Sequence, residues 1–190
     1  MIEVNPDPDI EAMRRLAEGD DLALNGIMDR WKQKLAAFFY RSTANHEVSI
    51  DLTQETFVKL YQSRHRYTPS ASFSTFLFSV AANLARNHAR WKSRHPVVSL
   101  DEEAHHQGGY LQDKNPSPDE SANQSDEMHQ VEIALKSLPV DLREALLLFT
   151  YEDMSHNEIA KITGCSVKAV ETRIYRARQA LREMLSRLRD

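Results

Sequence analysis

The stretch from Ser155 to Leu181, SHNEIAKITGCSVKAVETRIYRARQAL, decides the fold of the C-terminal part of the chain. Ser155 and Glu158 have the spacing of a capping box, in which a serine hydroxyl and a glutamate carboxylate bind the free backbone N–H groups that begin a helix. Gly164 ends this short helix, because glycine tolerates the left-handed conformation that follows many helices. Ser166 then caps a longer helix. Two helices joined by a tight turn are typical of a helix-turn-helix, whose second helix enters the major groove of DNA.

The second helix of this stretch has two contrasting faces. Its inward positions are apolar and recur at helical spacing: Val167, Val170, Ile174, Ala177 and Leu181. The opposite face is polar and basic: Lys168, Glu171, Thr172, Tyr175, Arg176 and Gln179. Seven bases and only two acids lie between residues 168 and 189, which places positive charge where DNA would lie. A helical hairpin that only packs against the rest of the chain is the alternative interpretation.

Length and composition limit what the rest of the chain can be. The 190 residues, 41% of them hydrophobic, suffice for one compact domain or two small ones. The 24 basic and 28 acidic residues nearly cancel, so the average charge indicates neither a nucleic-acid binder nor a membrane-surface protein. No apolar run approaches the ~20 residues of a membrane span, so direct membrane insertion is not expected. One cysteine, Cys165, and a start unlike a signal peptide predict a cytoplasmic location without a disulfide framework.

Charge is unevenly distributed along the chain. Residues 61–98 hold six bases and no acid, whereas residues 99–127 hold one base and eight acids, together with glycines and prolines. The acidic stretch has too few apolar residues to offset the entropy of ordering it. We therefore predict an all-α fold in which a flexible acidic linker, residues 99–127, joins two small helical domains, residues 1–98 and 128–190.

Two amphipathic helices are predicted before the basic segment. The first has an apolar stripe formed by Leu24, Ile27, Met28, Trp31, Leu35 and Phe38. The second follows Ser49, with inward positions at Leu52, Thr56, Phe57 and Leu60. Asp51, Gln54 and Glu55 share its outer face by their spacing. An acidic outer face is usually only solvated, and docking to another protein is the functional alternative.

Residues 67–91 combine a helical pattern with basic and aromatic side chains. Ser72 or Ser74 can cap a helix there. The inward positions of this helix are Leu77, Val80, Ala81 and Leu84, and its other face carries Asn83, Arg86, Asn87 and Arg90. Phe76 and Phe78 are expected in the core, whereas Phe73 and Trp91 are candidates for contact with bases. Aromatic rings stack on unpaired bases and arginines neutralise phosphates, so this segment favours single-stranded nucleic acid.

Two groups of motifs resemble one known family. The motifs DLTQETF at residues 51–57, FSTFL at 73–77 and ANLARN at 82–87 look like region 2 of the sigma-70 family. The Leu138-Pro139 pair with the helix after it, SHNEIA at 155–160 and residues 170–178 resemble region 4. With only these two regions in 190 residues, the chain is similar to the extracytoplasmic-function (ECF) class, which contains the smallest sigma factors.

The resemblance implies transcription initiation, with core RNA polymerase and promoter DNA as partners and with no catalytic activity or cofactor. The clamp helices of the largest polymerase subunit would bind Asp51, Gln54 and Glu55. The melted minus-ten element would be held by Phe73, Asn83, Arg86, Asn87, Arg90 and Trp91. The minus-thirty-five duplex would be recognised by Lys168, Glu171, Thr172, Arg173, Tyr175 and Arg176. Glu171 departs from the family, whose members often have a base there.

The resemblance also implies a regulator. ECF proteins are usually held inactive by an anti-sigma factor, often membrane-anchored, that covers their polymerase-binding surfaces. The acidic linker would run through polymerase channels as a nucleic-acid mimic, with a passive tether as the alternative.

Two further function classes follow from the residues alone. A stand-alone regulator would use only the helix-turn-helix on duplex DNA. An enzyme is disfavoured, because the sequence has no nucleophile–base set, phosphate-binding glycine loop or metal-ligand spacing.

Overall fold

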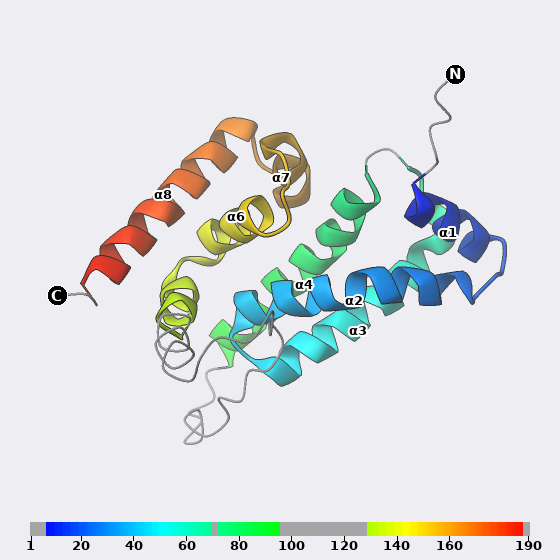
Figure 1. Cartoon of the computed structure of the whole chain (residues 1–190), viewed down its shortest axis with the longest axis horizontal. Helices are drawn as coiled ribbons and strands as arrows, with labels where there is room; N and C mark the ends of the chain where they lie inside the picture. The colour runs from blue at the N-terminus through cyan, green and yellow to red at the C-terminus, as the bar shows by residue number, and fades with distance from the viewer. Residues whose placement is uncertain (1–6, 70–71, 96–128, 188–190) are drawn as a thin grey trace, which may run out of the picture.

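The computed structural model describes residues 7–69, 72–95 and 129–187, and these residues form helices and no strand (Figure 1). The N-terminal half consists of α1 (Pro8–Ala17), α2 (Ala23–Thr43), α3 (His46–Ser63), the short η1 (Arg64–Arg66) and α4 (Phe73–Arg94). The C-terminal half consists of helical turns at 129–137, α6 (Val140–Thr150), α7 (His156–Thr163) and α8 (Val167–Ser186). The all-α prediction is confirmed, and the predicted linker lies outside the described residues.

The N-terminal half has a core formed by the predicted apolar stripes. The buried members of these stripes are Ile27, Leu35, Phe38, Leu52, Phe57, Leu60, Leu77, Ala81 and Leu84. Phe78 lies edge-on to Phe38, with 5.4 Å between the ring centroids, and edge-on to Trp31 at 6.1 Å. Helical periodicity therefore identified the inward faces of α2, α3 and α4 correctly.

Side-chain caps define where several helices begin and end. Ser72 accepts from the backbone N–H of Thr75, so Ser72 and not Ser74 caps α4. The predicted capping box of Ser155 and Glu158 begins α7. Gly164 ends α7 in the left-handed conformation, with φ of 66°, and Ser166 caps α8.

One inward position on α8 is placed differently from the prediction. Val167 is 37% exposed, whereas Val170, Ile174 and Ala177 are buried. Val167 is the first residue of α8, and only the next turn reaches the core.

The first helix is tied to the second by a buried carboxylate that the sequence pattern did not indicate. Asp9 is 5% exposed and accepts from Arg30 Nε at 2.8 Å and Nη2 at 2.6 Å, and from Trp31 Nε1 at 2.8 Å. These three hydrogen bonds satisfy a charge that would otherwise be costly to bury.

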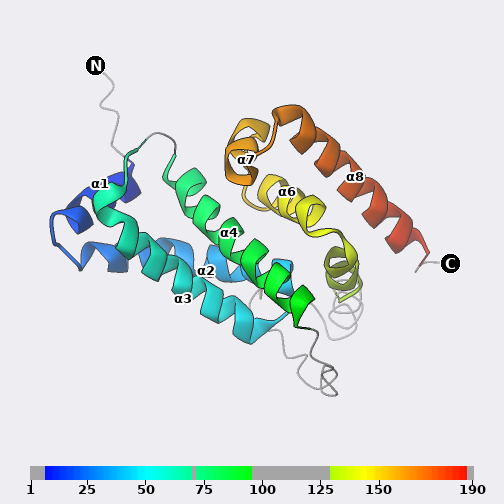
Figure 2. The same ribbon diagram turned by 180° about the vertical axis from the view of Figure 1, so that it is seen from behind.

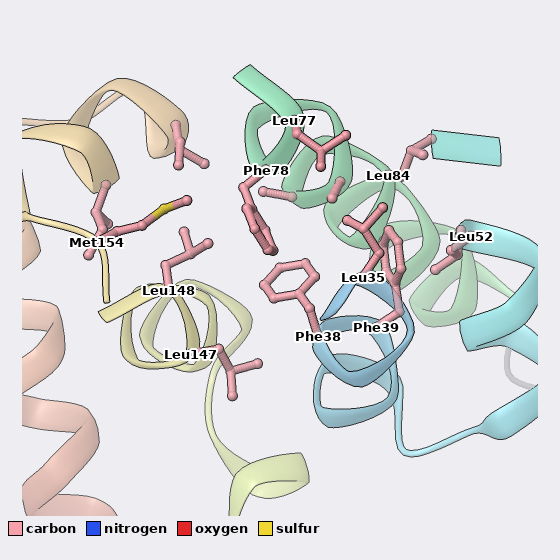
Figure 3. Close-up of a cluster of buried hydrophobic side chains, with 14 of the residues drawn as sticks. Leu35, Phe38, Phe39, Leu52, Leu77, Phe78, Leu84, Leu147, Leu148 and Met154 are labelled. Atoms are coloured by element: carbon pink, nitrogen blue, oxygen red, sulfur yellow. The ribbon is translucent and has the colours of Figure 1, made fainter. Parts of the chain in front are cut away.

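The two halves pack against each other along one apolar seam. Figures 1 and 2 show α4 between the α2–α3 layer on one side and α6 and α7 on the other. Figure 3 shows Phe38 and Phe78 of the N-terminal half facing Leu148 and Met154 of the C-terminal half. All these side chains belong to one continuous buried cluster. The sequence had left the relative placement of the two domains open.

Polar groups surround the seam near the end of α2. The guanidinium of Arg41 lies over the ring of Tyr151, 3.9 Å from its centroid, and the hydroxyl of Tyr40 donates to Glu132 at 3.2 Å. Burial raises the pKa of the neighbouring Glu152 to about 7, although the charges of Arg41 and Lys34 act in the opposite direction.

Replacing Asp9 tests the tie between α1 and α2. Asp9→Ala should lower the free energy of unfolding by about 2–4 kcal/mol, because Arg30 and Trp31 lose their shared acceptor. Urea denaturation measures the change. The matched control is Asp29→Ala, because Asp29 is exposed and its ion pair with Lys32 lies at the surface. Equal stability of both variants would contradict a structural role for Asp9.

The pKa of Glu152 predicts a pH dependence of stability. Because folding raises this pKa from 4.5, the stabilising effect of proton uptake is complete below that value and is lost as the pH rises through about 7. Relative to Glu152→Gln, the wild type should therefore lose on the order of 1–2 kcal/mol between pH 4.5 and 8. Chemical denaturation across this range measures the difference. Glu183→Gln, at an exposed position, should follow the wild type, and a parallel course for Glu152→Gln would contradict the prediction.

Candidate nucleic-acid and protein interfaces

The outer side of α3 combines acidic and apolar side chains. Asp51, Gln54 and Glu55 are all exposed there, as their spacing predicted. Ile50 is 41% exposed and Val58 is 52% exposed, and both fall on the same side at four-residue steps from Gln54. We call these five residues the α3 face. Ile50 and Val58 were not predicted to belong to this surface, although their four-residue spacing was available as a signal in the sequence. Exposed apolar side chains among charges suit a surface that binds another protein.

The outward side of α4 carries amides, a guanidinium group and an indole. Asn83, Asn87 and Arg90 are exposed, and Arg90 Nη2 donates to Asn87 Oδ1 at 3.1 Å. Trp91 is 53% exposed, and its ring stacks on that of His95 with 5.1 Å between the centroids. We call Asn83, Asn87, Arg90 and Trp91 the α4 polar face. It offers hydrogen-bonding and stacking groups together, which suits unpaired bases.

Phe73 does not belong to this surface, and its predicted contact with a base is wrong. The side chain is 1% exposed and packs against Trp31 and Tyr67, with centroid separations of 5.8 and 6.4 Å. Burying a phenylalanine stabilises a fold by roughly 1.5–3 kcal/mol, so an aromatic residue at the start of α4 serves the core. Phe78 is buried as expected, and Phe76 is partly buried against the same cluster.

Arg86 is directed toward the C-terminal half. Its Nη1 lies 2.5 Å from Oε1 of Glu144 on α6, and 28% of its side chain remains exposed. Glu144 is 7% exposed. Burial raises the pKa of Glu144 to about 7, while the charges of Arg86 and Arg173 act in the opposite direction. Arg86 therefore has an internal acidic partner in this arrangement.

The outer side of α8 presents the residues predicted to contact duplex DNA. Lys168, Tyr175 and Arg176 are exposed, with Tyr175 at 69%. Lys168 Nζ lies 3.0 Å from Oε2 of Glu171, and this contact lowers the pKa of Glu171. Glu171, the acid that departs from the family pattern, is thus paired with Lys168 on the same helix.

One predicted phosphate contact also has a structural partner. Arg173 Nε lies 3.3 Å from Asp141 Oδ2, which links α8 to the start of α6. An open hollow at this end of α8 is lined by four of the predicted residues: Lys168, Thr172, Arg173 and Arg176. The structure therefore brings most of the candidate residues on α8 together on one surface.

The part of the chain that the structure describes offers neither a metal site nor a membrane-spanning helix. These residues contain no group of three or more histidines, cysteines, aspartates or glutamates placed to hold a metal ion. None of the described helices combines the length and apolarity needed to cross a membrane.

Comparisons with known proteins identify the family of this chain. The family model for sigma-70 region 2 matches residues 27–95, and the model for sigma-70 region 4 matches residues 128–181. The ECF RNA polymerase sigma-E factor of Escherichia coli K12 is 33% identical over 174 residues, which cover 89% of this chain and 90% of that protein. The sigma-E factor of Haemophilus influenzae is 29% identical over 181 residues, covering 93% and 94% of the two chains.

Solved structures share the fold. CnrH, in complex with the cytosolic domain of CnrY, is similar with a TM-score of 0.70 and 26% identity, covering 95% of this chain and 98% of that one. The sigma factor RpoE of Bartonella quintana, in complex with the anti-sigma factor NepR, has a TM-score of 0.64 and 24% identity over 85% and 96%. Because both regions occur in order and the sigma-E relatives match over nearly their whole length, the chain belongs to the sigma-70 family of RNA polymerase sigma factors, in its ECF class.

Proposed function

We propose that three surfaces of this sigma factor divide the work of promoter-specific transcription initiation. The α3 face binds core polymerase, the α4 polar face captures the melted minus-ten strand, and the outer side of α8 recognises the minus-thirty-five duplex. In this proposal region 2 lies in residues 1–98, region 4 lies in residues 128–190, and residues 99–127 link them. The observation that carries it is the presence of all three surfaces on one chain, since a stand-alone regulator needs only the last.

The α3 face supports polymerase binding through its mixture of charge and exposed apolar surface. Asp51 and Glu55 give the face a negative potential that selects a basic partner surface and accelerates encounter with it. Ile50 and Val58 supply the apolar area that such contacts bury at their centre. We assign these two residues to the same binding surface.

The α4 polar face supports strand capture. Amides such as those of Asn83 and Asn87 can bond to the Watson–Crick edges of bases, which become accessible only after the duplex has opened. Trp91 offers a ring for stacking, and Arg90 offers positive charge for the backbone. A surface that binds the single strand and not the duplex increases the population of the open state through differential affinity.

The outer side of α8 supports recognition in the major groove. Arg176 is exposed and can bind O6 and N7 of a guanine through two hydrogen bonds. Lys168 and Arg173 would bind phosphates. Glu171 can accept from a cytosine amino group, and its pairing with Lys168 reduces its repulsion of the backbone.

Regulation by a protein partner completes the proposal. CnrH, 26% identical to this chain, forms its complex with the cytosolic domain of CnrY. We propose that an anti-sigma factor, often membrane-anchored in this class, likewise holds this chain in the cytoplasm until a signal releases it. The chain itself supplies specificity and no catalysis.

Run-off transcription tests the whole proposal. Core polymerase reconstituted with this chain should initiate from a defined subset of a random promoter library, and bases near the start site should react with permanganate. Protection of a duplex site without core polymerase and without melted bases would instead favour a stand-alone regulator.

Charge reversal on the α3 face should weaken polymerase binding. Asp51→Arg and Glu55→Arg replace attraction with repulsion, and each should lower the affinity for core polymerase at least about tenfold, or about 1.4 kcal/mol. Affinity is measured by pull-down and by fluorescence titration. Asp21→Arg is the control, because Asp21 is exposed in the loop between α1 and α2. Unchanged binding by all three variants would remove the α3 face from the polymerase interface.

Truncation of Arg176 should impair promoter recognition and leave polymerase binding unchanged. Arg176→Ala should reduce output from the cognate promoter by roughly 10–100-fold, since a lost two-bond contact with guanine is worth about 1–3 kcal/mol. Its affinity for core polymerase should stay at the wild-type value. Arg182→Ala, an exposed arginine farther along α8, is the matched control. If output and promoter choice both survive Arg176→Ala, another surface recognises the duplex.

A further inference from the structure

The side of α4 that faces the C-terminal half is occupied by carboxylates of that half. Arg86 and Glu144 form one ion pair across the seam. At the other end of α4, Glu158 accepts from the hydroxyls of Ser72 and Thr75 at 3.1 and 3.0 Å. The two contacts lie more than three helical turns apart, so they hold α6 and α7 along the length of α4.

Glu158 joins the beginnings of two helices from different halves. Its Oε2 accepts from the backbone N–H and the hydroxyl of Ser155, which closes the capping box of α7. Its Oε1 binds Ser72, the residue that caps α4, and the buried Thr75. The hydrogen bonds from Ser155, with smaller contributions from Thr75 and Ser72, lower the pKa of Glu158 and keep it charged. The full set of hydrogen bonds to the Glu158 carboxylate therefore forms only when both halves are in place.

The pairing of Arg86 has a consequence for DNA. A carboxylate and a phosphate are both anionic oxygen acceptors, and both prefer the same donors of a guanidinium group. Glu144 lies 2.5 Å from Arg86, so a phosphate cannot take its place unless α6 moves away. The inner carboxylate and the promoter strand therefore compete for this donor of Arg86.

We propose that the C-terminal half is an internal competitor for the minus-ten strand, in which Glu144 on Arg86 and Glu158 on the start of α4 hold the free chain closed. This inference rests on the proposed function for the direction of its effect on DNA. The closed arrangement leaves the α4 polar face exposed but withholds Arg86 and fixes α7 beside α4. A ligand that binds the open arrangement more tightly, such as core polymerase, shifts the population toward it.

Distances between the halves test the closed arrangement without polymerase or DNA. Nitroxide labels at Lys59→Cys on α3 and Arg182→Cys on α8, in a Cys165→Ser background, report the separation by pulsed electron paramagnetic resonance. The wild-type pairing should give one narrow distribution at pH 7.5. Glu144→Arg and Arg86→Glu place like charges together, and each should broaden the distribution toward longer distances. The double exchange, Arg86→Glu with Glu144→Arg, should restore the narrow distribution, and Glu183→Arg, which changes an exposed acid of the same half, should leave it narrow.

Strand affinity tests the competition. A fluorescein-labelled single-stranded DNA pool of random sequence should bind Glu144→Arg about tenfold more tightly than the wild type, and Glu183→Arg should show less than half of that gain. A broad distribution in the unmodified pair, or no restoration by the double exchange, would overturn the closed arrangement. Opening without any gain in strand affinity would overturn the competition. Failure of the chain to support transcription would count against the proposed function and would leave the distance result standing.

Discussion

The position of α4 between two layers of helices is the constraint on which the rest of the structure depends. Successive residues of a helix point in different directions, and three sides of α4 contact three different environments. One side, with Leu77, Ala81 and Leu84, is buried in the N-terminal half. A second meets α6 and α7 through Phe78 and Arg86, and the third is the α4 polar face. A ligand of the third side that also binds Arg86 therefore competes with the contact between the layers.

Signals that are local in the chain were sufficient to predict most helices and several candidate surfaces. The hydroxyl of Ser155 and the backbone of Glu158 are three residues apart, so their contact is visible in the sequence as a motif. The same holds for the outer positions of α3, because exposure follows from helical spacing once the inward stripe is known. Asp9 was not predicted, because its partners Arg30 and Trp31 lie 21 and 22 residues away and no periodicity links them.

Contacts across the seam could not be predicted from local sequence signals, and the reason is physical. Periodicity identifies which residues face inward but not which layer they face, so the sequence did not show that Phe38 and Leu148 share one core. Glu144 precedes a run of buried residues on α6, and a lone glutamate in such a run resembles a solvated position. Phe73 was misplaced for a related reason, since its burial depends on Trp31 and Tyr67, which lie elsewhere in the chain.

The chemistry of the seam suits halves that join in one state and separate in another. Apolar contacts such as those of Phe78 favour the closed arrangement of the two halves whether or not a ligand is bound. The free energy of burying apolar surface depends on its area and little on which apolar group covers it. A buried ion pair contributes little net free energy, since the desolvation of both groups offsets their attraction. The effect of the Arg86–Glu144 pair on opening depends on the groups that bind Arg86 and Glu144 after the pair breaks. Arg86 can then bind a phosphate, and Glu144 is hydrated by water. The hydrogen-bond donors, Arg86, Ser72 and Thr75, lie on the N-terminal half with the strand-binding residues, and the carboxylates lie on the C-terminal half. An anionic strand that binds the N-terminal half therefore favours separation of the two halves.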